Sequence, residues 1–300
     1  MQSLTYLQAI VIGLLQGATE LFPISSLGHS VLVPAWVGGD WQQLVTQESS
    51  AESPYLAFIV GLHVATALAL LVIFRRDWVA IVKGLVMSVR HRRVETVYER
   101  MAWLIVVATI PVGLMGLALE HALRVLFAKP EAAAIFLTVN GLILLAGEWL
   151  RRRAKRRTDV AATGEESGDE LDTAITESVR LPDAAIIGGL QVGALFAGIS
   201  RSGITMVGGL WRGLSHEEAV RFAFLLATPV ILAAGLYKVP DLFGSLGNGI
   251  RGQVVAGSVA AFLAAFVSAK FLVRWFRTRT LVPFAVYCLV VGLASVVRFA

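Results

Sequence analysis

Charged residues and cysteines are both scarce in this sequence. Asp, Glu, Lys and Arg make up only 16% of its 300 residues, and its mean hydropathy is +0.72, whereas soluble domains are about 25% charged. Few polar faces remain to meet water, which excludes an ordinary soluble fold. The single cysteine, Cys288, excludes an intrachain disulfide and does not indicate the redox compartment. These shortages point to a membrane protein.

Long uncharged runs take the place of the missing polar residues. Six apolar stretches are each close to the ~20 residues that an α-helix needs to cross the hydrocarbon core. They occupy residues 55–74, 102–119, 132–150, 218–238, 254–273 and 281–299. The alternating short strands of a membrane β-barrel do not occur in them. The sequence therefore predicts an all-α polytopic membrane protein with about six transmembrane helices.

Positive charge gathers in the loops between these stretches. The net charge is +5, and the clusters lie at residues 75–76, 90–93, 151–157 and 274–279. Because cytoplasmic loops carry excess Lys and Arg, we expect these loops in the cytoplasm. The basic balance then needs no nucleic-acid partner.

One short element occurs twice in the chain. Residues 16–29 read Gln-Gly-Ala-Thr-Glu-Leu-Phe-Pro-Ile-Ser-Ser-Leu-Gly-His, and residues 191–203 read Gln-Val-Gly-Ala-Leu-Phe-Ala-Gly-Ile-Ser-Arg-Ser-Gly. A shift of 175 positions (191 − 16) aligns Gln16 with Gln191, Ile24 with Ile199, Ser25 with Ser200 and Gly28 with Gly203. Broken apolar segments at matching places in two halves predict a site at the repeat interface, near mid-membrane.

Each copy lies in a segment that is too polar for one simple span. Residues 4–38 have room for two short helices joined around residues 23–28, and residues 183–209 repeat the design around residues 198–203. We predict two re-entrant helical hairpins that face the interior, because non-helical backbone at membrane depth needs protein or a wet cavity for its hydrogen bonds. The charge pattern makes the first hairpin enter from outside and the second from the cytoplasm, which gives an inverted repeat.

The domain organisation follows from this repeat. We interpret residues 1–300 as a single integral membrane domain, with a first half over 1–150 and a second half over 182–300. Between them, residues 151–181 begin with a basic run and continue with an acidic one, which predicts a flexible cytoplasmic linker.

Glu20 is the first candidate for chemistry. It lies in an apolar segment four residues after Gln16, so the two share one face of a helix. A carboxylate within the membrane is costly and points to function; a structural hydrogen bond to a neighbouring helix is the alternative. Carboxylate and amide oxygens are ligands suited to Mg²⁺ or Ca²⁺, and Glu20 can also serve as a general base.

The turn after Glu20 holds two hydroxyls and an imidazole, from Ser25, Ser26 and His29. This combination can supply a nucleophile and its proton partner, although serines also cap helices and a lone histidine is often satisfied within a core. Beside Glu20 we favour catalysis. His63, within an apolar span, is interpreted as structural.

The second copy supplies an anion-binding arrangement. A guanidinium stands between two hydroxyls with a glycine on each side, at Gly198, Ser200, Arg201, Ser202 and Gly203. Arginine matches phosphate oxygens, and backbone N–H groups at a helix start add donors. The alternative is a structural pair between Arg201 and Glu20 across the repeat interface, and both interpretations can hold in the empty protein.

Three segments of this chain resemble, in order and spacing, the three best-marked segments of a known family, the bacterial undecaprenyl-diphosphate phosphatases of the UppP/BacA type, which are associated with bacitracin resistance. These segments are residues 16–29, 197–203 and 222–229. The hydrophobic layout agrees over most of the chain. Two positions depart from the family pattern: Ala197 stands where proline is usual, and Gln16 where glutamate is commoner. The linker is also long for the family.

The resemblance implies an enzyme of the bacterial plasma membrane that hydrolyses undecaprenyl diphosphate to undecaprenyl phosphate and inorganic phosphate, recycling the lipid carrier for peptidoglycan synthesis. It implies a nucleophilic role for Ser26, an essential role for His29 and phosphate binding by Arg201, with Mg²⁺ or Ca²⁺ near Gln16 and Glu20. Ser26, His29 and water all stay open as the attacking group. A flippase or transporter for the lipid, alone or combined with the phosphatase, is the alternative.

The expected partners are the polyprenyl diphosphate lipid and the bilayer, with no nucleic acid. Small residues such as Gly113 and Gly116, three positions apart, also allow close helix contact. That contact fits either packing within the chain or a homodimer.

Overall fold

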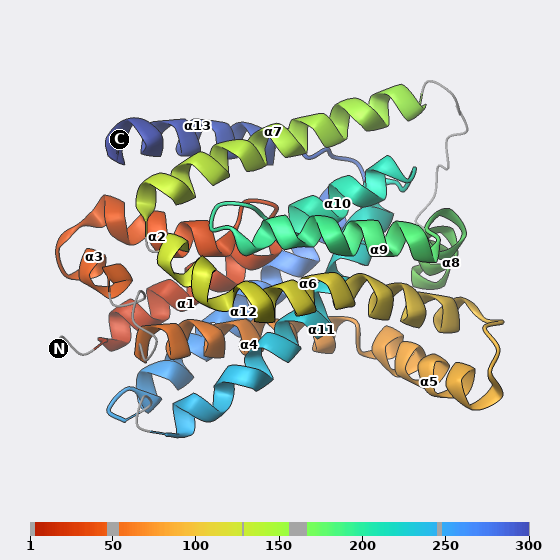
Figure 1. Ribbon diagram of the computed structural model, residues 1–300, viewed down its shortest axis with the longest axis horizontal. Coiled ribbons are helices and arrows are strands. Elements are labelled where there is room, and N and C mark those ends of the chain that lie inside the picture. Colours follow the sequence, from red (N-terminus) through yellow and green to blue (C-terminus); the bar gives the residue numbers. More distant parts are fainter. Residues whose placement is uncertain (1–3, 47–53, 128, 156–166, 245–247, 300) are drawn as a thin grey trace.

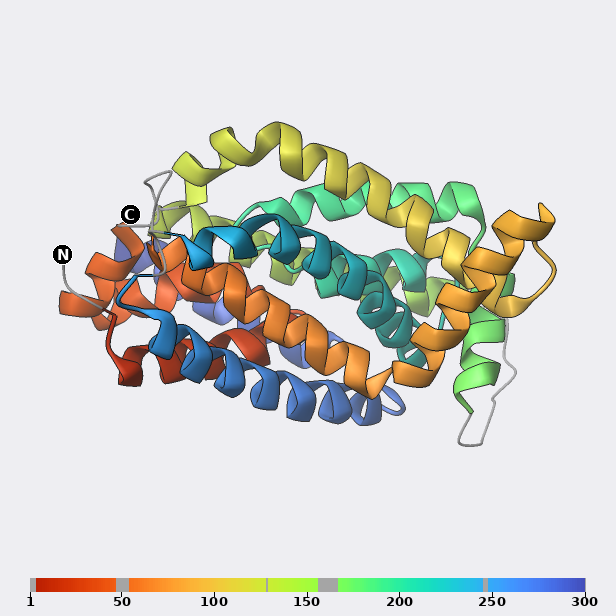
Figure 2. The same cartoon turned by 90° about the horizontal axis from the view of Figure 1, so that it is seen from below.

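The computed structural model describes residues 4–46, 54–127, 129–155, 167–244 and 248–299. All regular elements in these residues are helices, which confirms the all-α prediction. The long helices run side by side along the longest axis, and the two ends of the chain lie at the same end of the bundle (Figures 1 and 2).

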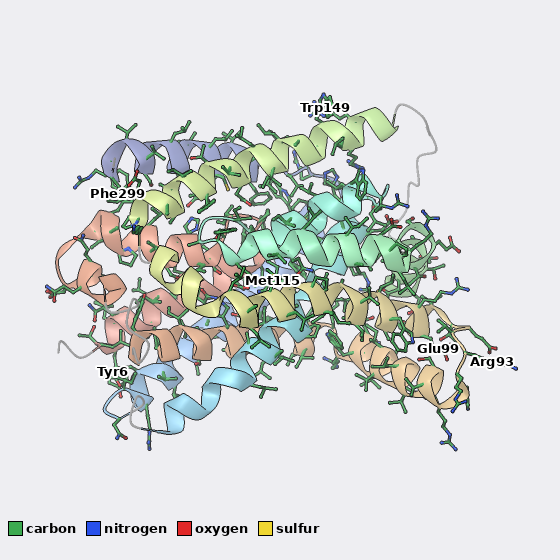
Figure 3. All side chains as sticks on the ribbon, in the orientation of Figure 1. Tyr6, Arg93, Glu99, Met115, Trp149 and Phe299 are labelled. Carbon is green, nitrogen blue, oxygen red and sulfur yellow. The ribbon has the colours of Figure 1, made fainter. Side chains whose placement is uncertain are left out.

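Each predicted transmembrane stretch falls within one helix or extends beyond its end by one residue. These helices are α4 (Pro54–Ile73), α6 (Val97–Phe127), α7 (Pro130–Lys155), α11 (His216–Phe243), α12 (Arg251–Phe276) and α13 (Val282–Phe299). Among the described residues, α6, α7, α11, α12 and α13 are long and apolar enough to cross a membrane, and α4 contributes a shorter apolar stretch, Gly61–Ile73. Carbon dominates the flank around Met115, whereas charged side chains such as Arg93 lie toward one end (Figure 3). The flanks therefore suit lipid.

The first predicted hairpin consists of α1 (Tyr6–Leu21) and α2 (Ser26–Val37), followed by the short helix α3 (Gly39–Thr46). Thr5 caps α1 by accepting a hydrogen bond from the backbone N–H of Gln8 at 3.2 Å. The helix ends at Phe22, which is extended (ψ 143°) as residues before proline usually are. Pro23 thus ends one helix, and the next begins three residues later.

The second predicted hairpin is shorter and more irregular. It consists of α9 (Leu181–Leu190), a 3₁₀ helix η2 (Gln191–Leu195) and α10 (Arg201–Trp211). Asp183 joins the two arms, because its carboxylate accepts the backbone N–H of Arg180 at 3.0 Å and pairs with Arg212 at 3.1 Å.

Glycines bring the first arm of each hairpin against a spanning helix. A Cβ atom at Gly17 of α1 would collide with the backbone of Ala261 in α12, and one at Gly188 of α9 would collide with the backbone of Ala108 in α6. Small residues permit this close packing of helices in membranes. The hairpins are thereby held within the bundle by backbone contact.

One end of the bundle carries α5 (Arg75–His91) and α8 (Gly168–Ser178) (Figure 2). The segment 151–181, which the sequence predicts to be flexible, is more ordered than expected: it includes the end of α7 and all of α8, while residues 156–166 lie outside the described residues. Asp172 of α8 is fully buried and pairs with Arg221 of α11 at 2.7 Å. This ion pair fixes α8 to the bundle, which an alternation of charges along the sequence does not reveal.

Candidate active site

The two hairpin turns carry the same helix cap at equivalent positions. Ser25 Oγ accepts a hydrogen bond from the N–H of Gly28 at 3.2 Å, and Ser200 Oγ accepts one from the N–H of Gly203, also at 3.2 Å. In each case the serine is the N-cap and the glycine lies in the first turn of the following helix. The aligned residues therefore have the same local role.

The two turns touch each other inside the bundle. The N–H of Gly198 donates to Ser25 Oγ at 3.1 Å, and the Ser202 hydroxyl donates to the carbonyl of Phe22 at 3.3 Å. A Cβ atom on Gly28 would approach the Cα atom of Gly198 to 2.8 Å. Direct backbone contact of this kind requires glycine, and it places the first helical residues of α2 and α10 next to one another.

Asn140 of α7 joins both turns. Its side-chain amide donates to the carbonyl of Pro23 at 2.9 Å, and its Oδ1 atom accepts the N–H of Ser200 at 2.9 Å. The residue is fully buried. Sequence reasoning missed it, although an asparagine within the predicted span 132–150 is the kind of intramembrane polar residue that indicates a role.

Glu20 is the centre of the cluster. Its Oε1 atom pairs with Arg201, and its Oε2 atom accepts hydrogen bonds from the Ser26 hydroxyl and, at 3.0 Å, from the Gln16 amide. The Nε2 atom of His63 lies 3.3 Å from the same oxygen. The side chain of Glu20 is only 6% exposed. One buried carboxylate therefore holds together a hydroxyl, an amide, an imidazole and a guanidinium from α1, α2, α4 and α10.

His63, which the sequence analysis interprets as structural, contacts Glu20. Its Nδ1 atom lies 2.8 Å from the carbonyl of Ile59, while Nε2 faces Glu20. Because a neutral imidazole has a single N–H, a ring with an acceptor at each nitrogen donates to both only as imidazolium. With Arg201, the cluster then has two basic side chains around one carboxylate. That balance suits an anionic ligand.

His29 is engaged on the other side of the turn. Its Nδ1 atom lies 2.7 Å from the carbonyl of Ser25, and Nε2 lies 2.8 Å from the hydroxyl of Tyr287 in α13. The two rings also stack, with their centroids 5.7 Å apart. Within the described residues, the contacts of the His29 ring thus hold the turn and do not join Glu20 or Ser26. Sequence reasoning did not identify Tyr287.

The arrangement meets the requirements of phosphoryl transfer. The Ser26 hydroxyl donates to a carboxylate that can take its proton. Arg201 lies at the start of α10, where the first backbone N–H groups have no partner within the helix and favour an anion. Groups that can serve as nucleophile, base and anion ligand therefore occupy one buried cluster.

The same cluster has ligands for a divalent cation. The Oε1 atom of Gln16 is buried and has no hydrogen-bond partner within the described residues, and Glu20 lies beside it. The described residues contain no group of three or more His, Cys, Asp and Glu side chains that could hold a metal. An amide oxygen and a carboxylate fit a cation such as Mg²⁺, which takes few protein ligands and completes its shell with water and substrate phosphates.

Comparison with known proteins identifies the relatives of this chain. The family model described as "Bacitracin resistance protein BacA" matches residues 9–294. "Undecaprenyl-diphosphatase" of Mycolicibacterium paratuberculosis is 59% identical, over 99% of this chain and 98% of its own length. "Undecaprenyl-diphosphatase 2" of Frankia alni is 55% identical, over 100% of this chain and 99% of its own. A third such protein, from Granulibacter bethesdensis, is 43% identical over 98% and 97%.

Proposed function

The chain belongs to the bacitracin resistance protein BacA family, and from this premise we propose that it is an undecaprenyl-diphosphatase. It removes the terminal phosphate of undecaprenyl diphosphate and leaves undecaprenyl phosphate and inorganic phosphate. The observation that carries this function is the buried contact of Ser26, Glu20 and Arg201, which joins the two hairpins. A carrier that only binds its cargo does not need a hydroxyl hydrogen-bonded to a carboxylate beside the anion site.

Substrate binding uses the second hairpin. The prenyl tail stays in the bilayer while the diphosphate enters between the turns, where Arg201 exchanges Glu20 for phosphate oxygens. We propose that further phosphate contacts come from the turn and the start of α10, at Ser25, Gly198, Ser200, Ser202 and Gly203, with the substrate taking the place of hydrogen bonds that these groups make to each other, to Asn140 and to Phe22. Glycine at 198 supports this role, because its φ of +110° is a backbone conformation that other residues rarely adopt.

Catalysis uses the first hairpin. Ser26 Oγ attacks the terminal phosphorus and its proton passes to Glu20; the anhydride P–O bond breaks, and undecaprenyl phosphate leaves with the proton that Glu20 returns. Water then attacks the phosphoserine and gives a proton to Glu20; the bond between Ser26 Oγ and phosphorus breaks, Glu20 returns that proton to Ser26 Oγ, and inorganic phosphate is released. The Ser26 to Glu20 hydrogen bond supports this route over attack by His29, whose ring contacts Ser25 and Tyr287. We propose that His29 contributes by fixing the turn.

A divalent cation, Mg²⁺ or Ca²⁺, fits beside these residues. Gln16 and Glu20 would hold it, and when bound it offsets the negative charge of the diphosphate. His63 keeps Glu20 in place from α4 when Arg201 turns to the substrate.

The surroundings of the enzyme follow from the same family. We propose that the protein lies in the bacterial plasma membrane, that the end with α5, α8 and the segment 151–181 is cytoplasmic, and that its product re-enters peptidoglycan synthesis as the lipid carrier. A Cβ atom added at Gly113 would meet nothing within 4 Å. The helix surface there leaves room for a second copy, so a homodimer stays part of this proposal.

Phosphate release from undecaprenyl diphosphate by the purified chain in detergent with Mg²⁺ tests the function. We expect Ser26→Ala to fall to background and Arg201→Ala to lose about 10²–10³-fold, as when one charge-stabilising donor is removed. Ser88→Ala and Arg279→Ala, at the end with α5, serve as matched controls and keep full activity. Lipid binding without phosphate release by the folded wild type would instead indicate a flippase.

A further inference from the structure

Helix α5 is amphipathic but does not qualify as a span. With 17 residues, α5 is not among the helices that are long and apolar enough to cross a membrane. Four of its valines are nevertheless strongly exposed. These are Val79, Val82, Val86 and Val89, with exposed fractions of 70%, 54%, 59% and 59%. Spacings of three and four residues place them on one helix face, which we call the valine stripe.

The opposite face of α5 accounts for its packing on the protein. Ile81, Gly84 and Ser88 are buried, and the Ser88 hydroxyl accepts a hydrogen bond from the Trp103 indole of α6 at 3.0 Å. A Cβ atom at Gly84 would meet the backbone of α6 within 3 Å. The helix is therefore firmly seated with its valine stripe turned outward. That stripe is left for something outside the chain.

The charges of α5 are unbalanced. Its one acid, Asp77, pairs with Arg221 at 2.7 Å. Four of its basic residues have no ion pair within the described residues, namely Arg75, Arg76, Lys83 and Arg90. By helical spacing, Arg76, Lys83 and Arg90 lie along one border of the valine stripe. The free charge beside the stripe is thus entirely positive.

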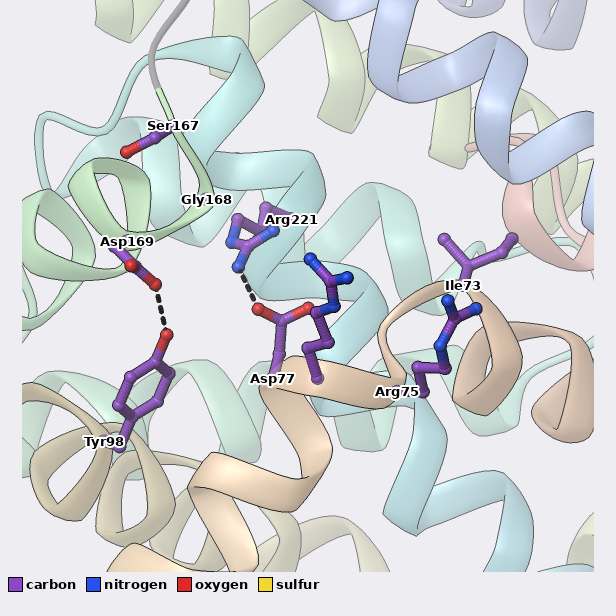
Figure 4. A pocket seen from close by; sticks show the side chains of 9 residues that line it. Ile73, Arg75, Asp77, Tyr98, Ser167, Gly168, Asp169 and Arg221 are labelled. Carbon is purple, nitrogen blue, oxygen red and sulfur yellow. Dashed lines mark hydrogen bonds and ion pairs between the residues drawn. The ribbon is translucent and has the colours of Figure 1, made fainter.

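Two adjoining cavities lie where α4 passes into α5. The first, of about 600 Å³, is lined by Arg75, Arg76, Asp77, Tyr98 and Asp169, among others, and is shown in Figure 4. Asp77 is taken by Arg221, and Asp169 accepts the hydroxyl of Tyr98 (Figure 4). The acids in this cavity are already engaged, which leaves Arg75 and Arg76 as its unpaired charges.

The second cavity, of about 320 Å³, shares Ile73 with the first. It combines apolar walls, from Phe74 and Val273, with the cations of Lys270, Arg274 and Arg277 of the α12 end. Arg277 pairs with Glu217 at 3.0 Å, and the apolar walls beside Lys270 and Arg274 suit a lipid phosphate with an acyl chain.

We propose that α5 is an interfacial helix that binds an anionic phospholipid of the cytoplasmic leaflet. The valine stripe enters the acyl boundary, and the headgroup phosphate lies at the α4–α5 corner between Arg75, Arg76 and Arg274. A lipid occupant is favoured over a protein because only Phe74 separates α5 from the apolar helix α4, so that α5 starts where the bilayer ends. Basic residues beside an apolar stripe are the pattern that holds a helix in an anionic interface. The proposal stands independently of the phosphatase reaction.

The test uses the full-length protein. After purification from membranes containing phosphatidylglycerol and phosphatidylethanolamine, the lipids retained are measured by mass spectrometry. We expect Arg75→Gln with Arg76→Gln to lose several-fold of the retained phosphatidylglycerol and little phosphatidylethanolamine. The control, Arg92→Gln with Arg93→Gln, removes the same charge at the other end of α5 and should retain both lipids. Equal retention by the two double variants would overturn the proposal.

A second measurement reports on the stripe itself. An environment-sensitive dye on Val86→Cys, in a Cys288→Ala background, is compared in vesicles of phosphatidylcholine with and without phosphatidylglycerol. We expect blue-shifted emission shielded from an aqueous quencher, with shielding that increases with phosphatidylglycerol. A dye that stays accessible to the quencher in both vesicles, or one shielded only where cross-linking reveals a second copy, contradicts lipid docking.

Discussion

The two hairpins have the same helix cap, but the backbone conformation of the capping serine differs between them. Ser25 and Ser200 each cap the following helix through a glycine N–H at 3.2 Å. Ser25 does so with φ at +69°, whereas Ser200 has φ at −89°, and in the second turn the positive φ falls on Gly198. A serine with positive φ costs energy that the surrounding contacts must offset. The turn that precedes Ser26, the proposed nucleophile, is thus the strained one.

The hairpins also differ in charge at equivalent positions. With the shift of 175, Glu20 corresponds to Leu195 and Arg201 corresponds to Ser26. Gln191, the counterpart of Gln16, is fully buried and has no hydrogen-bond partner for either side-chain amide atom within the described residues. The shared feature is therefore the cap, and the chemistry comes from what is not shared. One hairpin supplies the acid and the hydroxyl, and the other supplies the cation.

Removing the charge of the first hairpin should have the largest effect. In Glu20→Gln the shape stays, but the base that receives the Ser26 proton is lost, and we expect kcat for phosphate release to fall about 10³-fold. Single-turnover phosphate release from undecaprenyl diphosphate measures it. Glu131→Gln, at the first turn of α7, is the matched control and should keep full activity. If Glu20→Gln keeps a tenth of the wild-type rate, Glu20 is not the base that receives the Ser26 proton.

Adding a side chain at Gly198 should force the second turn away from α7. A Cβ atom at Gly198 would approach the carbonyl oxygen of Ala133 and the nitrogen of Leu137 to 2.5 Å, in a conformation with φ at +110°. We expect Gly198→Ala to lower the free energy of unfolding by about 3–5 kcal/mol, from strain and overpacking together. Thermal unfolding in detergent measures the loss.

The control for this change is also an alanine on the second hairpin. Gly189 of α9 has no atom within 4 Å of an added Cβ, so Gly189→Ala should be neutral or gain up to about 1 kcal/mol from helix propensity. Equal Tm values for the two variants would mean that the second turn does not press against α7 as the structure has it.

Cutting the link through α7 should separate the two turns. In Asn140→Leu the carbonyl of Pro23 and the N–H of Ser200 both stay buried without their partner, which costs about 1–3 kcal/mol for each group. Thr138→Val, on the same helix, removes only a bond to its own helix carbonyl, and we expect its Tm to change by less than half as much. The comparison of the two melting curves in detergent decides whether α7 joins the hairpins.

The architecture was predictable because local sequence determines both the membrane helices and the breaks between them. Apolar length sets the spans, and Pro23 and the glycines near residue 200 set the turns. The pairing of Glu20 with Gln16 follows from a spacing of four on one helix, and its pairing with Arg201 was anticipated from the repeat. Local sequence pattern and repeat symmetry are therefore enough to predict the contacts of Glu20 with Gln16 and Arg201.

The residues that sequence reasoning missed all come from other helices. Asn140 contacts the first turn from α7 and Tyr287 contacts His29 from α13, while the contact of His63 of α4 with Glu20 was not expected from its structural interpretation. No periodicity links these positions to the turn, because helix packing and not chain proximity brings them together. The α8 segment was missed for the same reason: its order depends on Asp172 meeting Arg221, which is 49 residues away.

The smallest expected effect concerns the third helix at the site, which neither hairpin provides. If His63 holds Glu20 through Nε2, then His63→Ala should lower kcat/KM about tenfold, and His63→Gln should recover most of it because the amide can donate to the same oxygen. Thr66→Val removes a buried hydroxyl that bonds only within α4, and it should leave kcat/KM unchanged. Phosphate release at several substrate concentrations measures all three. Rescue by glutamine distinguishes a hydrogen bond to Glu20 from a need for positive charge at residue 63, since the amide donates without carrying a charge. Wild-type kcat/KM in His63→Ala would return His63 to the structural role that the sequence alone indicates, and the site would then belong to the two hairpins only.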